Sequence, residues 1–223
     1  MSTPAPTTAA PNTAAPNTAG PLRIAVVYYS STGTIAALAR EISETAEKAG
    51  AEVRLRRAPE LAPRSAIESN PAWAENLRAT EDIPEASPSD VDWADAVLLG
   101  TPTRFGNVSA QLKQVLDQLG PLWAEGRLAD KVYSGFTSSA SPHGGQESTL
   151  LALYNSVHHF GGLTVAPGYT DQSKFVDGNP YGTSHTDAQG NNPVDETART
   201  AARVQTERVI RIAEALKAGL AVS

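Results

Sequence analysis

The chain has 223 residues, of which 40% are hydrophobic and 19% charged; its formal net charge is −6 and it contains no cysteine. This length suits one domain with a sizeable core, and the acidic balance argues against a nucleic-acid partner, since phosphodiester backbones attract basic surfaces. Without cysteine, disulfides, thiolate metal sites and thiol nucleophiles are excluded, which fits a cytoplasmic protein. No stretch approaches the roughly 20 apolar residues of a membrane span.

The N-terminal segment MSTPAPTTAAPNTAAPNTAGP, residues 1–21, contains five prolines and the sequence AAPNTA twice. It has neither the basic region nor the apolar region of a signal peptide. Its small polar residues offer little to bury, so we predict a disordered tail over 1–21 and one folded domain over 22–223.

Beyond the tail, strand-like and helix-like segments begin to alternate. The apolar run LRIAVVYY at 22–29 predicts a buried strand. Apolar residues then recur at helical spacing from Ile35 to Ala46, and Gly50 follows where a helix would be capped. The weakly alternating segment 51–58 predicts a second strand.

The Pro-rich segment 59–90 is irregular, with one short helix expected at 73–79. After it we predict strands at 96–101, 132–137 and 163–167, helices at 108–120 and 146–160, a polar loop at 169–193, and a last helix that buries Val209, Ile212, Ala213 and Leu216. This order predicts an α/β protein, a doubly wound sandwich with a five-stranded parallel sheet.

Three polar loops follow strands of this predicted sheet, at 30–34, 102–107 and 138–145. Open parallel sheets bind ligands at the carboxyl ends of their strands, near the point where the strand order reverses. We therefore expect the three loops to converge on one ligand site.

The first of these loops, SSTGT at 30–34, has the composition of a phosphate site without a cation. It lacks the lysine of a triphosphate loop, and Gly33 alone cannot make the G-x-G-x-x-G fingerprint of dinucleotide sites. What remains is a helix N-terminus whose N–H groups, with the hydroxyls of Ser30, Thr32 and Thr34, can hold one terminal phosphate. This pattern is typical of flavodoxin-like sites for the monophosphate of FMN; alternatively, the hydroxyls only cap the helix.

The second loop belongs to a more distinctive segment, GTPTRFGNVSAQLKQVLDQLGPLW at 100–123. It resembles the WrbA family of flavodoxin-like, FMN-dependent NAD(P)H:quinone oxidoreductases, whose PTRFGN segment stands intact at 102–107. Further elements of the family follow in order: LDQ (116–118), GPLW (120–123), GGQE (144–147), HH (158–159), GY (168–169) and PYG (180–182). The resemblance covers residues 22–219.

The resemblance implies a cofactor, a substrate contact and an assembly. FMN would be held by Ser30, Ser31, Thr32, Gly33, Thr34, Ile35, Pro102, Thr103, Arg104, Phe105, Gly106, Ser138, Ser139, Gly144 and His159. Trp123 matches the family's substrate-contacting tryptophan, at a site shared between subunits of a homotetramer; a packing role for this tryptophan is the alternative. Arg104 could stabilise negative charge on reduced flavin, whereas a surface salt bridge is its alternative role.

Two departures from the family pattern bear on the site. The third loop, SSASPHGGQE, is one residue longer than the family's glycine-rich version and contains Pro142 and His143. Thr32 stands where the family often carries an aromatic residue associated with the nicotinamide, so the preference for NADH or NADPH is not carried over. The adjacent His158 and His159 do not have the spacing of a metal pair on a helix.

The function implied is two-electron, ping-pong reduction of quinones by NADH or NADPH through FMN, with no catalytic side chain and no metal. There is no G-x-S-x-G elbow of a serine hydrolase. The alternatives are a flavodoxin-type electron carrier, which the acidic charge would suit, and a protein that has kept the fold but lost flavin or quinone reductase activity.

Overall fold

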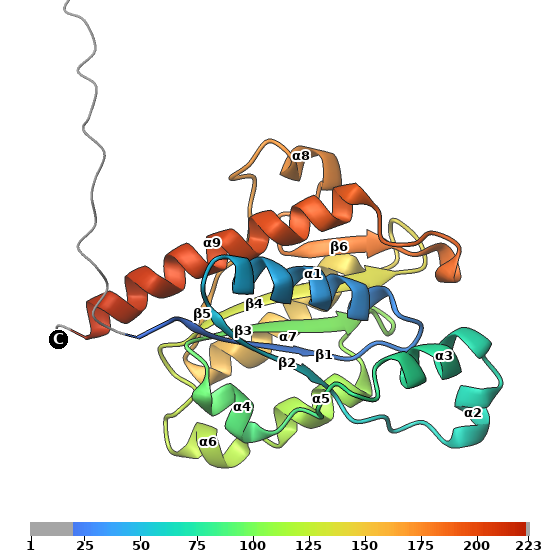
Figure 1. Ribbon diagram of the computed structural model, residues 1–223, viewed down its shortest axis with the longest axis horizontal. Helices are drawn as coiled ribbons and strands as arrows, with labels where there is room; N and C mark the ends of the chain where they lie inside the picture. Colours follow the sequence, from blue (N-terminus) through green and yellow to red (C-terminus); the bar gives the residue numbers. More distant parts are fainter. Residues whose placement is uncertain (1–19, 222–223) are drawn as a thin grey trace, which may run out of the picture.

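The computed structural model describes residues 20–221, so the tail predicted for 1–21 lies almost entirely outside the described residues. Six parallel strands form one sheet: β1 (Arg23–Tyr28), β2 (Glu52–Arg57), β3 (Ala96–Pro102), β4 (Val132–Ser139), β5 (Leu163–Thr164) and β6 (Thr183–Thr186). Their order is β2-β1-β3-β4-β5, and β6 also pairs with β4 (Figure 1). The doubly wound α/β class is thereby confirmed, with one strand more than the five predicted.

Helices cover both faces of the sheet, and each face has its own core. Along β1, Ile24 and Val26 pack toward α1 (Thr34–Lys48) and α9 (Glu196–Leu220), while Ala25 and Val27 pack toward the opposite helices. These are α4 (Pro88–Trp93), α5 (Ala110–Asp117), α6 (Gly120–Ala124) and α7 (Gln146–Phe160) (Figure 1). The predicted face of the last helix is confirmed, since Val209 and Ala213 are buried and Ile212 and Leu216 pack against the same core.

The fifth strand position is divided between two short strands. β5 pairs with the start of β4, at Val132 and Tyr133, and β6 pairs with its end, from Phe136 to Ser139. Residues 165–182 leave the sheet between them and include α8 (Lys174–Asp177). The strand predicted at 163–167 is thus confirmed only over its first two residues, and the prediction of a loop at 169–193 is wrong, because that segment contains α8 and β6.

The polar sequence of β6 explains that error, because the segment TSHT at 183–186 lacks the apolar side chains by which strands are predicted. The preceding Gly182 lets the chain approach β4 closely: a Cβ there would lie 2.2 Å from the carbonyl oxygen of Gly135. Glycine at this position thus permits the second half-strand to join the sheet.

The connections differ from prediction in two further places. The helix expected at 108–120 ends at Asp117, and Pro121, which cannot donate a backbone hydrogen bond, lies in the first turn of the separate helix α6. The segment 59–90 contains α2 (Arg64–Glu68) and α3 (Pro71–Ala79) in addition to the start of α4. Asn70 caps α3 by accepting from two of its N–H groups. Within residues 20–221, no helix is long and apolar enough to cross a membrane.

Candidate functional site

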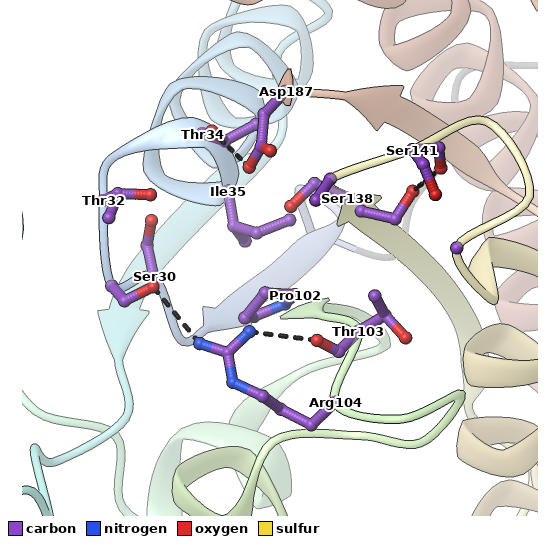
Figure 2. A pocket seen from close by; sticks show the side chains of 14 residues that line it. Ser30, Thr32, Thr34, Ile35, Pro102, Thr103, Arg104, Ser138, Ser141 and Asp187 are labelled. Atoms are coloured by element: carbon purple, nitrogen blue, oxygen red, sulfur yellow. Dashed lines mark hydrogen bonds between the residues drawn. The ribbon is translucent and has the colours of Figure 1, made fainter. Parts of the chain in front are cut away.

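A pocket of about 270 Å³ lies at the carboxyl edge of the sheet, where the three predicted loops meet (Figure 2). It is lined by Ser30, Ser31, Thr32, Thr34, Ile35, Pro102, Thr103, Arg104, Ser138, Ser139, Ala140, Ser141, Gly144 and Asp187. Eleven of these were predicted as cofactor contacts from the sequence. The expected convergence of the loops is confirmed, and Ala140, Ser141 and Asp187 are additions.

The first loop turns into α1 through Gly33, whose φ of +99° is a conformation that other residues rarely adopt. No side chain caps this helix, and its first internal bond is donated by the Ala37 N–H to the Gly33 carbonyl. The N–H groups of Thr34, Ile35 and Ala36 precede that bond and are free of intrahelical acceptors. The alternative, that the hydroxyls of this loop cap the helix, is therefore wrong; Ser30 Oγ accepts from the Gly33 N–H within the loop itself.

The first loop is braced by α3, a contact that the sequence did not reveal. Asn76 Nδ2 donates to the Ser30 carbonyl oxygen at 2.8 Å. Just before the loop, Tyr29 donates its hydroxyl to Glu60 at 2.9 Å. Polar residues in an irregular Pro-rich segment gave no signal of this role, because the contacts join residues 31 to 46 positions apart.

Glu60 is the centre of this brace. Five donors converge on its carboxylate at 2.8 to 3.0 Å: the side chains of Tyr29, Trp73 and Gln111 and the backbone N–H groups of Leu61 and Ala62. Burial alone would raise the pKa of Glu60, but these hydrogen bonds outweigh it and hold the pKa below its ordinary value. An ionised Glu60 thus ties Tyr29, which precedes the first loop, to α3 and α5.

Arg104 spans the mouth of the pocket from the second loop to the first. Its guanidinium donates to the Thr103 carbonyl at 2.9 Å and to Ser31 Oγ at 3.3 Å (Figure 2). Within the described part of the chain it has no carboxylate partner, so a surface salt bridge is not its role. The next residue, Phe105, is fully exposed and has a φ of +55°, a strained conformation for a side chain of this size.

The third loop forms one wall of the pocket. Ser138 and Ser139 remain buried at the end of β4, and Ser139 Oγ accepts from Gln146 Nε2 at 2.8 Å. Pro142 and His143 are exposed and lie outside the lining of the pocket. The altered loop therefore leaves the pocket open.

Two close-packed glycines join the second and third loops. A Cβ on Gly145 would lie 2.9 Å from Gly106 Cα, and one on Gly106 would lie 2.8 Å from Ser148 Oγ. Gly33, Phe105 and Gly106, also predicted as contacts, thus belong to the loops around the pocket but do not line it.

His159 and Trp123, both predicted as contacts, do not line the pocket within one chain. They lie together near the C-terminal end of α7, where Trp123 Nε1 donates to the His159 carbonyl at 2.8 Å. The pocket lies at the other end of this 15-residue helix, about 20 Å away at 1.5 Å per residue. More than half of the Trp123 side chain is exposed (56%).

A parallel sheet of order 2-1-3-4-5 with a pocket of phosphate-site character at its carboxyl edge defines a flavodoxin-like nucleotide-binding protein. Residues 22–174 match the family model described as NADPH-dependent FMN reductase, and the chain belongs to this family.

Relatives and solved structures agree with this assignment. The protein named NAD(P)H dehydrogenase (quinone) of Deinococcus radiodurans is 45% identical over 193 residues, which cover 86% of this chain and 96% of that protein. NAD(P)H dehydrogenase (quinone) 3 of Rhizobium meliloti is 39% identical over 206 residues, covering 88% and 94%. A flavodoxin, WrbA-like protein from Agrobacterium tumefaciens superposes with a TM-score of 0.62 at 26% identity, covering 86% of this chain and 97% of that one. The resemblance to the WrbA family is confirmed.

The pocket fits FMN. Uncapped N–H groups at the start of α1, with hydroxyls from the first loop beside them, suit a monophosphate held by neutral donors. The remaining wall combines Pro102 and Thr103 with the serines that end β4, which offers hydroxyl partners for a polar ribityl chain.

Proposed function

We propose that the protein is an FMN-dependent NAD(P)H:quinone oxidoreductase that reduces quinones to hydroquinones by a two-electron, ping-pong mechanism. The observation that carries the proposal is the uncapped start of α1, with its hydroxyl-rich loop, facing Pro102, Thr103 and Arg104 of the PTRFGN segment across one pocket. The names of the relatives support the same activity.

FMN, when bound, supplies the redox chemistry: it accepts hydride from NAD(P)H and gives two electrons to the quinone. The N–H groups of Thr34 and Ile35 would hold its phosphate, and Ser138 and Ser139 would face its ribityl chain. Arg104, the one cation that lines the pocket in the described chain, would stabilise negative charge on the reduced flavin. These side chains bind and orient; none is required as an acid, base or nucleophile.

We also propose that the active unit is a cytoplasmic homotetramer. Trp123 and His159 lie away from the pocket of their own chain, and the exposure of Trp123 is consistent with a contact to a neighbouring subunit. Thr32 lines the pocket in place of an aromatic platform, so the choice between NADH and NADPH would rest on other contacts.

The test is the visible spectrum of the purified protein with FMN, before and after anaerobic NADH or NADPH. Flavin bands that bleach with a nicotinamide and return on addition of a quinone are expected. Bound flavin that neither nicotinamide bleaches would instead indicate an electron carrier. A protein that binds no flavin would overturn the proposal.

Arg104→Ala tests the role of the pocket's cation. Because its guanidinium reaches both the first and second loops, its loss should weaken FMN binding several-fold and slow quinone reduction. Arg64→Ala is the matched control, since Arg64 is an exposed residue of α2 paired with Glu68. Equal FMN affinity and turnover in the two variants would remove Arg104 from the site.

A further inference from the structure

The pocket contains a carboxylate at the place where its phosphate site begins. Among the described residues that line it, the two charged ones are Arg104 and Asp187, which lie on opposite sides (Figure 2). Asp187 Oδ2 accepts from Thr34 Oγ1 at 3.3 Å, and Thr34 is the first residue of α1. A negative side chain is thus already beside the helix end that should attract the phosphate.

The backbone around Asp187 is fixed. Its N–H donates to the Ser139 carbonyl at 2.9 Å, which continues the pairing of β6 with β4, and its own carbonyl accepts from Gly190 and Asn192 at 2.9 Å. Its Oδ1 accepts from the Gln189 N–H at 3.0 Å, which caps the short 3₁₀ turn that follows. Because both carboxylate oxygens are engaged, the charge is held at the pocket wall.

A fixed carboxylate at this position has two opposing electrostatic effects. It interacts favourably with the N-terminal end of the α1 dipole, and it therefore competes with a phosphate for the same partial positive charge. It also repels a phosphate directly, and this repulsion is stronger at a partly buried site than in bulk water. Neutral hydroxyls, which make up the rest of the phosphate loop, do not offset that repulsion.

We propose that Asp187 is a specificity-determining residue that lowers the affinity of the pocket for a flavin phosphate, so that FMN is bound exchangeably rather than as a permanent group. The inference rests on the proposed function, because it takes the ligand to be FMN. The proposal predicts that the phosphate group adds less to the affinity for FMN than the free N–H donors at the start of α1 would suggest.

Asp187→Asn tests this directly, because asparagine keeps an oxygen for the Gln189 N–H and is a favoured capping residue, while it removes the charge. Full-length flavin-free protein is titrated with FMN and with riboflavin, which lacks the phosphate, and quenching of flavin fluorescence gives both dissociation constants. EDTA is present throughout, so that no divalent cation bridges carboxylate and phosphate. The matched control is Glu47→Gln, which removes one negative charge from an exposed position near the far end of α1.

Asp187→Asn should tighten FMN binding about tenfold or more, because removing one of two like unit charges a few ångströms apart has at least this effect at a dielectric between those of water and a protein surface; it should leave riboflavin binding unchanged. The gain should shrink in high salt, and Glu47→Gln should reproduce none of it. An unchanged ratio of the two dissociation constants would overturn the inference while leaving the proposed function intact. Equal weakening of both flavins would also overturn it, because Asp187 would then be a partner of the ribityl chain. A wild-type protein that binds neither flavin would overturn both proposals.

Discussion

Replacing Glu60 by glutamine should both destabilise the fold and loosen the phosphate loop. The wild-type carboxylate accepts five hydrogen bonds. A glutamine can keep its carbonyl oxygen toward the two backbone N–H groups and Gln111, but its NH₂ group then faces the indole N–H of Trp73 and leaves that donor without an acceptor.

The size of the effect follows from the number and kind of these bonds. Hydrogen bonds to a charged group contribute about 1.5–3 kcal/mol each and neutral ones about 0.5–1.5 kcal/mol. The bonds that survive are weakened and one is lost, while partial exposure of Glu60 reduces every contribution. We therefore expect a loss of roughly 2 kcal/mol in the free energy of unfolding, or about 4–8 °C in Tm for a domain of this size.

Urea denaturation of the FMN-free protein and an FMN titration measure the two consequences separately. The affinity for FMN should fall several-fold, because two contacts between Glu60 and the phosphate loop are disturbed. Tyr29, which immediately precedes the loop, donates to Glu60. Trp73 anchors α3 to Glu60, and Asn76 of the same helix donates to the Ser30 carbonyl. Glu68→Gln, on the exposed helix α2, is the matched control and should change stability by only a few tenths of a kcal/mol. If Glu60→Gln and Glu68→Gln gave the same midpoint and the same FMN affinity, the brace would have no energetic role.

The pH dependence of the unfolding free energy, compared between wild type and Glu60→Gln, tests the charge on Glu60. Since its folded pKa lies below the unfolded value of about 4.3, the ionised carboxylate stabilises the fold fully above that value, and this contribution is lost as the pH falls through the folded pKa. The difference in unfolding free energy between wild type and Glu60→Gln should therefore narrow on acidification below about pH 5. A difference that stayed constant down to pH 3 would mean that folding does not lower the pKa of Glu60.

Two further substitutions test the divided strand. Gly182→Ala should cost about 3 kcal/mol or more, because its Cβ would lie 2.2 Å from a backbone oxygen of β4, whereas Gly120→Ala, with open space at its Cβ, should be neutral in the same thermal scan. Lys174→Met should cost about 3–5 kcal/mol, because it leaves the nearly buried Asp177 without its 2.5 Å partner. Adding Asp177→Asn should restore part of that loss in urea denaturation; no recovery would mean that the pair is not coupled.

Much of this fold can be predicted from apolar pattern alone. The run ahead of Ser30 identified β1, and the helix predicted at 146–160 has those bounds, because it lies between the conformationally free Gly145 and Gly161. The three loops of the pocket could be located as well, since strands that end at one edge of a parallel sheet bring their loops together.

The sequence could not predict the residues that act through distant contacts. Glu60 and Asn76 hold the phosphate loop from a segment that is Pro-rich and irregular, and nothing local distinguishes them from solvated polar residues. Asp187 was missed for another reason: it follows a strand made of small polar residues, which has the composition of a loop. Its neighbour Thr34 was found only because it belongs to a recognisable motif.

The placement of Asp187 depends on the buried side-chain amide of Gln205, which lies where β6 begins. Gln205 of α9 is fully buried; its Oε1 accepts from the Thr183 N–H at 2.7 Å, and its Nε2 donates to Ser134 Oγ and the Gly135 carbonyl at 2.6 and 2.7 Å. One side chain therefore holds the start of β6 against β4. Because β6 then runs four residues in register to the pocket edge, the register set at Thr183 determines that Asp187, and not a neighbour, faces Thr34. The position of the charge at the phosphate site is thus determined by contacts at the start of β6, away from the pocket. A shift of one residue in the register of β6 would turn the Asp187 side chain to the other face of the sheet.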